Sequence, residues 1–227
     1  ESGAGFKTRA VSVAQRRELV NAANQDPQPS EKLEGDARRV MADTEAQVAF
    51  HTAKELCKET QELVFSLLKS NMEDMYISAG WAWDDAEKRN ELFSPTSRLL
   101  LCTSTAQGDE SGKLLGFCHY RFELYSDLKP SRPVLYVYEL QLAEGARRKG
   151  LGKRLMSIAE AIGAEKRMSV VVLTVFKTNV AAIKLYEGAG YTLDPSDPSK
   201  WDRTECYAIM SKPIAAPPSD CEAKPVE

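Results

Sequence analysis

The chain has 227 residues, a formal net charge of −3, 43% hydrophobic and 28% charged residues, a composition ordinary for a globular domain. It has no run of 18 apolar residues, so no transmembrane helix is predicted, and its net charge makes nucleic acid a poor default partner. Its five cysteines form no CxxC pair and its two histidines lie at no metal-ligand spacing. We therefore expect reduced thiols, as in a nuclear or cytosolic protein, and no metal.

The first part of the chain is predicted to be mainly helical. A helix is expected over residues 5–25, and the proline-containing stretch "DPQPSE" ends it. Residues 31–45 are polar and give no clear prediction, whereas 46–53 alternate as a strand does. The strongest helical periodicity covers residues 58–78, and a short helix capped by Asp84 or Asp85 follows it.

The second part of the chain alternates strands and helices around a glycine-rich turn. "RLLLCTS" and "KLLGFCHYRFEL" predict a hairpin, and residues 134–142 form a third, very apolar strand. After the turn we expect a helix over 151–166, a buried parallel strand over 168–176, a helix over 179–189 and a last strand within 200–212. This order predicts a single α/β domain with a mixed sheet.

The turn "EGARRKGLGKRL" matches only one of three phosphate-binding patterns. The dinucleotide fingerprint lacks its third glycine, and the P-loop lacks its lysine after the second glycine. The pattern R-x-x-G-x-G fits Arg147, Gly150 and Gly152, where glycines let backbone N–H groups approach phosphates beside a helix N-terminus. Cations just before a helix oppose its dipole unless an anion is bound there, so a pyrophosphate site is predicted.

Two motifs resemble the GNAT acetyltransferase superfamily. One is R-x-x-G-x-G after an apolar strand, and the other is "NVAAIKLYEGAGY" at residues 179–191, which resembles N-x-x-A-x-x-x-Y-E-x-x-G-[FY]. The resemblance covers about residues 97–210. It implies an α/β GNAT fold, with a mixed, mostly antiparallel sheet, splayed central parallel strands, flanking helices and an N-terminal helical extension.

A narrower resemblance is to the N-terminal acetyltransferase D (NatD) family. It is carried by "YVYELQL", "RRKGLGK", "LTVFKTN" and "MYISAGWAWDDAEKR". That family acetylates the α-amine of histones beginning Ser-Gly-Arg-Gly. The resemblance implies acetyl-CoA as co-substrate without a metal, and histone N-terminal tails as substrate. It also implies no direct contact with nucleic acid or membrane, a monomer without an auxiliary subunit, and a nuclear and cytoplasmic location.

The expected domain organisation follows from the same resemblance. Residues 1–45 are expected to form a helical extension that packs on the core, 46–212 the acetyltransferase domain, and 213–227 a disordered tail.

The catalytic residues implied by the resemblance are Glu139, Glu123 and Tyr138. An acid inside the apolar strand "VLYVYELQL" is unusual, and the resemblance makes Glu139 the general base. Glu123 stands where the family usually has Asp, and either binds the substrate or is the base. The purely structural alternatives are an ion pair at a sheet bulge for Glu139 and a strand-end surface charge for Glu123.

The remaining site residues are divided between cofactor and peptide. Tyr136 and Tyr138 are two apart, so both are expected to face the same side and line the peptide site; an aromatic core stripe is the alternative. The resemblance assigns to the cofactor Leu140, Gln141 and Leu142 (pantetheine, as an added strand), Arg147, Arg148, Lys149, Gly150, Leu151, Gly152 and Lys153 (pyrophosphate), Asn179, and Tyr186 (in place of the usual acid for the leaving thiolate). To the peptide it assigns Tyr76, Trp81, Glu123, Tyr136, Tyr138, Thr174, Ser196 and Tyr207.

Two other functions stay open from the sequence. One is a lysine or small-amine acetyltransferase on the same fold, against which the tyrosine- and tryptophan-rich segment and "YVYE" argue. The other is a non-catalytic CoA-binding module, for which a strand without its acid would have been expected; Glu139 is present.

Overall fold

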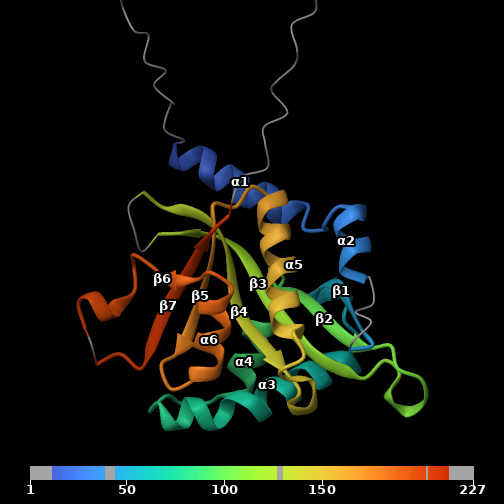
Figure 1. The fold of residues 1–227 in the computed structure, drawn as a ribbon. Helices are drawn as coiled ribbons and strands as arrows, with labels where there is room; N and C mark the ends of the chain where they lie inside the picture. The colour runs from blue at the N-terminus through green and yellow to red at the C-terminus, as the bar shows by residue number, and fades with distance from the viewer. Residues whose placement is uncertain (1–11, 39–43, 127–129, 203, 215–227) are drawn as a thin grey trace, which may run out of the picture.

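A computed structural model describes residues 12–38, 44–126, 130–202 and 204–214 (Figure 1). The helices are α1 (Val13–Gln25), α2 (Glu31–Arg38), α3 (Lys58–Ser78), α4 (Asp85–Leu92), α5 (Leu151–Glu165) and α6 (Val180–Gly188). The strands are β1 (Ala46–Thr52), β2 (Arg98–Ser104), β3 (Leu114–Tyr125), β4 (Arg132–Leu142), β5 (Val170–Phe176), β6 (Thr192–Leu193) and β7 (Tyr207–Pro213).

The seven strands form one sheet in the order β1-β2-β3-β4-β5-β7-β6. Every neighbouring pair is antiparallel except β4 and β5, which are parallel. Those two strands pair only from Val134–Val137 on β4 to Val170–Leu173 on β5, and β4 then continues to Leu142 without β5. The predicted α/β fold, with a mostly antiparallel sheet and splayed central parallel strands, is confirmed.

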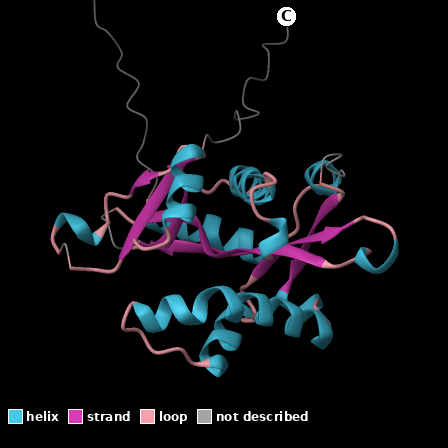
Figure 2. Cartoon of the chain, turned by 60° about the horizontal axis from the view of Figure 1, so that its bottom comes forward, coloured by secondary structure: helices cyan, strands magenta, loops and turns pink. Residues whose placement is uncertain are grey.

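Helices cover both faces of this sheet (Figure 2). On one face, buried residues of α1, α2 and α5 join a large core with Leu100, Tyr120 and Leu135 of the sheet. On the other face, α3 and α4 pack on Leu99, Leu101 and Phe117. The five inner strands therefore send alternate side chains into cores on the two faces, as a period of two requires.

The N-terminal helix α1 is fixed to the sheet although it is shorter than predicted. Residues 5–11 of the expected helix lie outside the described residues, and α1 begins after Ser12, which forms a capping box with Gln15. Val20 and Ala23 are buried in the core, and Asn24 Nδ2 donates a hydrogen bond to the Phe122 carbonyl at 3.1 Å. The extension thus packs on β3, whereas its boundary at residue 45 stays a prediction.

Three elements differ from the sequence prediction. Helix α2 forms in the polar stretch that gave no clear pattern, because Ala37 is buried in the core and Leu33 packs against it. The two-residue strand β6 was not predicted either, since it pairs only with β7. β7 runs through Pro213, and the Ile214 N–H donates to the Ser169 carbonyl, so the predicted disordered tail begins too early; residues 215–227 lie outside the described residues.

The cysteines of the described residues form no disulfide with one another. Cys57, Cys102, Cys118 and Cys206 are free thiols. Within the same residues, no group of three metal-ligating side chains is found, and no helix has the length and apolar character needed to cross a membrane.

Candidate active site

A β-bulge in β4 creates the site. In the β3–β4 ladder, His119 faces Glu139 and the next residue, Tyr120, faces Val137, so Tyr138 is the extra residue on β4. Regular alternation would send Tyr138 and Glu139 to opposite faces. Because of the bulge, both line the same cleft, and the bulge lies just beyond the last β4–β5 pair.

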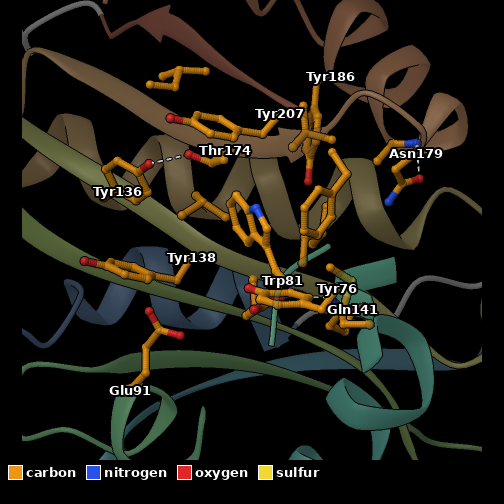
Figure 3. A pocket seen from close by; sticks show the side chains of 18 of the residues that line it. Tyr76, Trp81, Glu91, Tyr136, Tyr138, Gln141, Thr174, Asn179, Tyr186 and Tyr207 are labelled. Atoms are coloured by element: carbon orange, nitrogen blue, oxygen red, sulfur yellow. Dashed lines mark hydrogen bonds between the residues drawn. The ribbon is translucent and has the colours of Figure 1, made fainter. Parts of the chain in front are cut away.

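The cleft between the splayed strands has a volume of about 610 Å³. Figure 3 shows side chains from β4, β5, β7, α3 and α6 converging on it. The predicted site residues that line it are Tyr76, Trp81, Tyr136, Tyr138, Glu139, Leu140, Gln141, Thr174, Asn179, Tyr186 and Tyr207. The topology therefore gathers most of the predicted catalytic and peptide residues, which span more than 130 positions of the sequence, in one place.

Glu139 is a buried carboxylate, with 8% of its surface exposed. Burial raises its pKa from an ordinary 4.5 to about 7, and the nearby Glu91 carboxylate adds to the rise. The hydrogen bond from Gln141 Nε2 to Glu139 Oε2, at 2.7 Å, and the charge of Lys88 oppose it. At neutral pH this carboxyl group can therefore exist both with and without its proton, which is what a general acid or base needs.

Tyr138 and Glu123 form a second polar pair. The Tyr138 hydroxyl donates a 2.6 Å hydrogen bond to Glu123 Oε1. Burial and this bond raise the pKa of Tyr138, so its hydroxyl keeps its proton at neutral pH. Glu123 does not itself line the cleft among the described residues; it reaches the site through Tyr138.

His119, the histidine opposite Glu139 on β3, is buried. Burial, together with the charges of Arg121 and Lys88, lowers its pKa to about 3. Its Nε2 lies 2.9 Å from Ser97 Oγ, and its ring lies 5.2 Å from that of Tyr138. His119 is therefore neutral and packs behind the tyrosine.

One wall of the cleft is aromatic. The Tyr76 ring makes edge contacts with Trp81 and Phe176 at 5.7 and 5.2 Å, and Trp81 also contacts Tyr207 at 5.7 Å. Trp81 remains 39% exposed, so it lies at the rim and not in the core. On the far side, the Tyr136 hydroxyl and Thr174 Oγ1 lie 2.6 Å apart (Figure 3).

Helix α4 contributes a charged pair that the sequence did not indicate. Lys88 Nζ donates to Glu91 Oε2 at 3.0 Å and to the Tyr76 hydroxyl at 2.8 Å. Burial lowers the pKa of Lys88, but these two bonds outweigh it and raise the pKa overall. Glu91 lines the cleft, and its spacing in "AEKRNELF" carries no signal that distinguishes it from an ordinary surface acid.

The glycine turn has the backbone expected of an anion site. Arg148 and Gly150 have φ angles of 65° and 80°, and Gly150 is the N-cap of α5. The Arg154 N–H bonds to the Gly150 carbonyl, so the amides of the preceding helical residues have no helical acceptor, as at any helix start. A Cβ on Gly152 would lie 3.2 Å from Leu185 Cδ2, so this close packing fits glycine.

Arg147 lies in the same turn but is held by the protein. Its Nε donates to the Leu142 carbonyl at 3.2 Å, and its Nη2 donates to Asn71 Oδ1 at 2.7 Å. Arg148, Lys149 and Lys153 are exposed beside it and are the free-standing cations of the turn. The side chains and the helix start together can hold a phosphate-bearing ligand.

Two residues of the second motif lie at the opposite lip of the cleft. Asn179 caps α6 by accepting a 3.1 Å hydrogen bond from the Ala182 N–H. Tyr186 is buried, and burial, with Cys118 and Glu139 nearby, raises its pKa, so its hydroxyl stays protonated. Figure 3 shows both residues at the cleft.

Ser196 lies behind the cleft. Its hydroxyl donates to Asp194 Oδ1 at 2.6 Å and lies 3.0 Å from the hydroxyl of Tyr125, which does line the cleft. Asp194 is in turn bound through both oxygens by Arg132, each at 3.0 Å. Within the described residues Ser196 therefore supports Tyr125 and does not face the cleft.

The comparisons with known proteins agree with this geometry. The model of the acetyltransferase (GNAT) family matches residues 64–191, more than half of the chain. The chain is similar to the structure of Arabidopsis thaliana NAA60 in complex with a bisubstrate analogue (14% identity, 75% of this chain and 100% of that chain, TM-score 0.55). It is also similar to the structure of the NatC complex bound to Gag peptide and CoA (15% identity, 74% of this chain and 99% of that chain, TM-score 0.54). A third similar structure is that of PaiA N-acetyltransferase from Thermoplasma acidophilum in complex with coenzyme A (17% identity, 74% of this chain and 99% of that chain, TM-score 0.50). The chain belongs to the GNAT acetyltransferase family.

Proposed function

We propose that this chain is an N-terminal acetyltransferase of the NatD type, which acetylates the α-amine of histones that begin Ser-Gly-Arg-Gly. Acetyl transfer follows from the family; the finer specificity is supported by the NatD-like segments and by the chemistry of the cleft. Three of those segments contribute Tyr76, Trp81, Tyr138, Glu139 and Thr174 to a single cleft.

The single observation that carries the proposal is the raised pKa of Glu139, at about 7. A protein α-amine has a pKa of about 7.7–8.0, so moving its proton to Glu139 costs roughly 1 kcal/mol. A lysine amine, with a pKa of about 10.4, would cost roughly 4–5 kcal/mol for the same transfer. A base with this pKa therefore takes a proton from an α-amine at lower cost than from a lysine side chain.

The other titratable groups near Glu139 are each held in another role. Tyr138 and Tyr186 keep their protons, and His119 is buried behind Tyr138. Glu91, the other carboxylate of the cleft lining, accepts a 3.0 Å hydrogen bond from Lys88. Glu139 is thus the base that the geometry favours, with Tyr138 held beside it by Glu123.

Acetyl-CoA supplies the activated acetyl group as its thioester. The glycine turn can hold its pyrophosphate, because the first amides of α5 have no helical acceptor and exposed cations lie beside them. Beyond the bulge, Leu140 and Leu142 lie on a strand edge that β5 leaves unpaired, and this edge can pair with the pantetheine arm. Tyr186 holds a proton at Oη on the other lip, where a departing sulfur would need an acid.

The test is an acetylation assay read by mass spectrometry with three peptides. One begins Ser-Gly-Arg-Gly-Lys, the second replaces Ser by Met, and the third is the first peptide with its α-amine blocked. Only the first should gain an acetyl group, on its α-amine. Acetylation of lysine in the blocked peptide would overturn the proposal in favour of a lysine acetyltransferase, and binding of CoA without any transfer would favour a non-catalytic module.

The same proposal extends to partners and place. The enzyme would act as a monomer without an auxiliary subunit, in the nucleus and the cytoplasm, without binding nucleic acid or membrane. Analytical ultracentrifugation of the active protein tests the first of these statements.

A further inference from the structure

Four side chains form a continuous line of hydrogen bonds from the glycine turn to Glu139. Arg147 Nη2 donates to Asn71 Oδ1 at 2.7 Å, and Asn71 Nδ2 donates to Gln141 Oε1 at 3.0 Å. Gln141 Nε2 then donates to Glu139 Oε2 at 2.7 Å. The line joins three separate elements, because Asn71 lies on α3, Gln141 and Glu139 on β4, and Arg147 just before α5.

The direction of every bond in this line is fixed by two groups that bind Asn71, the Arg147 guanidinium and the Leu142 carbonyl. A guanidinium can only donate, and the Leu142 carbonyl, which accepts from Asn71 Nδ2 at 3.1 Å, can only accept. These two groups allow Asn71 one amide orientation, with its oxygen toward Arg147 and its nitrogen toward Gln141 and Leu142. That orientation turns the Gln141 oxygen toward Asn71, so the Gln141 nitrogen must face the Glu139 carboxylate.

We propose that Asn71 is a positioning residue for Glu139: through Gln141 it keeps a hydrogen-bond donor on the catalytic carboxylate, and through Arg147 it ties that donor to the cofactor turn. An amide turned the other way would place the Gln141 oxygen against the carboxylate and destabilise its ionised form. The catalytic part of this inference rests on Glu139 being the base, as proposed above.

The line acts among several other groups that face Glu139. These groups are Lys88 and Glu91 on α4, Tyr76 on α3, Cys118 and His119 on β3, and Tyr186 on α6. Of these, Lys88 favours the ionised carboxylate, whereas burial and Glu91 disfavour it. Gln141 donates the hydrogen bond that favours the ionised carboxylate, so the orientation of its amide affects the charge on Glu139.

The test uses variants that remove one link each. Asn71→Leu, Gln141→Met and Arg147→Met remove the middle, inner and outer links while keeping apolar volume. Gln61→Leu is the matched control, since Gln61 lies on the same helix and loses a 3.0 Å bond to the Leu56 carbonyl without touching the line.

The first readout is the folding equilibrium constant between about pH 5 and pH 8.5, which requires no acetyl transfer. If Asn71→Leu raises the pKa of Glu139 by about one unit, the constant should fall about eightfold more at pH 8.5 than at pH 5, compared with the wild type. The same substitution in a Glu139→Gln background should show no such pH dependence, because no carboxylate is left to ionise. Gln141→Met should act more strongly than Asn71→Leu, and Arg147→Met more weakly.

The second readout is the pH profile of kcat/KM. The acid limb of Asn71→Leu should move up by about one unit, so that activity falls about eightfold near pH 6.5 and recovers near pH 9. An equal loss of stability at every pH, or one that persists with Gln at position 139, would overturn the positioning role. If the pH-dependent loss of stability is present but the acid limb does not move, the hydrogen-bonded line stands and the assignment of Glu139 as base fails.

Discussion

Replacing Glu139 by Gln should make the protein more stable and much less active. Burial raises the pKa of this carboxyl group from 4.5 to about 7, so the folded state holds a proton that the unfolded chain has already lost. Between pH 4.5 and about 7 the free energy of unfolding falls as the pH rises, because the folded state binds more protons than the unfolded state. A shift of this size corresponds to about 3 kcal/mol above pH 7.

The gain from Glu139→Gln should therefore depend on pH. Near pH 4.5 and below, Glu139 is protonated in both states and the variant gains little. Above pH 7 the gain should approach about 3 kcal/mol, less the cost of any unpaired amide hydrogen, which is about 6–12 °C in melting temperature for a chain of this size. The Gln141 donor still finds an oxygen on the new side chain, so the fold around it should be kept.

Thermal denaturation of wild type and variant at a series of pH values measures this difference directly, since all other titrating groups are common to both. Loss of a positioned base should lower kcat by about 10²–10⁴-fold, with acetyl-CoA affinity near wild type and partial rescue at high pH. A melting-temperature difference that does not change with pH would refute the claim that folding raises the pKa of Glu139. Near-normal kcat in Glu139→Gln, but not in Glu123→Gln, would show that the other carboxylate is the base.

Three further outcomes follow from the same structure. Gly152→Asp should greatly weaken CoA binding in calorimetry, because it adds both a close contact and a carboxylate beside the phosphates, whereas Gly145→Asp, with open space around its Cβ, should bind CoA far better than Gly152→Asp. CoA should slow hydrogen exchange at the amides of Leu140 and Leu142, which lie on the strand edge that β5 leaves open; unchanged exchange would exclude pairing there. Asp194→Asn should lower the free energy of unfolding by about 3 kcal/mol at neutral pH, because Arg132 is then left without the buried carboxylate that it binds. This loss should shrink in acid, where the wild-type carboxylate is itself protonated.

The sequence predicted the elements whose patterns are local. The helix of residues 58–78 matches α3 in both bounds, since its apolar residues recur at helical spacing. The two glycines of the turn also lie where glycine is required, since Gly150 takes a positive φ and Gly152 packs closely against α6. Their role in binding a pyrophosphate stays a prediction. By contrast, α2 and β6 gave no pattern, since each is stabilised by contacts with distant parts of the chain.

Most residues that line the cleft were predicted from the sequence, whereas the hydrogen bonds between them and the contributions of α3 and α4 were not. Glu139 was evident as an acid in an apolar strand, and the cleft now gives it a raised pKa. The sequence did not indicate Glu91 or Asn71, because an acid or an amide is common on the polar surface of a helix. Only the folded structure shows that Asn71 bonds to Gln141 on β4 and that Glu91 lines the cleft. Arg147 matched a phosphate-binding pattern, yet its side chain bonds to α3, a contact across 76 positions that spacing cannot reveal.

The bulge at Tyr138 determines on which face of the sheet Glu139, the proposed base, lies. Leu135 and Val137 lie in the core under α5, and uninterrupted alternation would send Glu139 into that core as well. A carboxylate there would be fully enclosed by apolar side chains and would remain protonated at neutral pH. The extra residue shifts Glu139 to the opposite face, where Gln141 and the cleft leave its pKa near neutrality. Because the bulge follows the last β4–β5 pair, the residue proposed as the base lies next to the strand edge that β5 leaves unpaired.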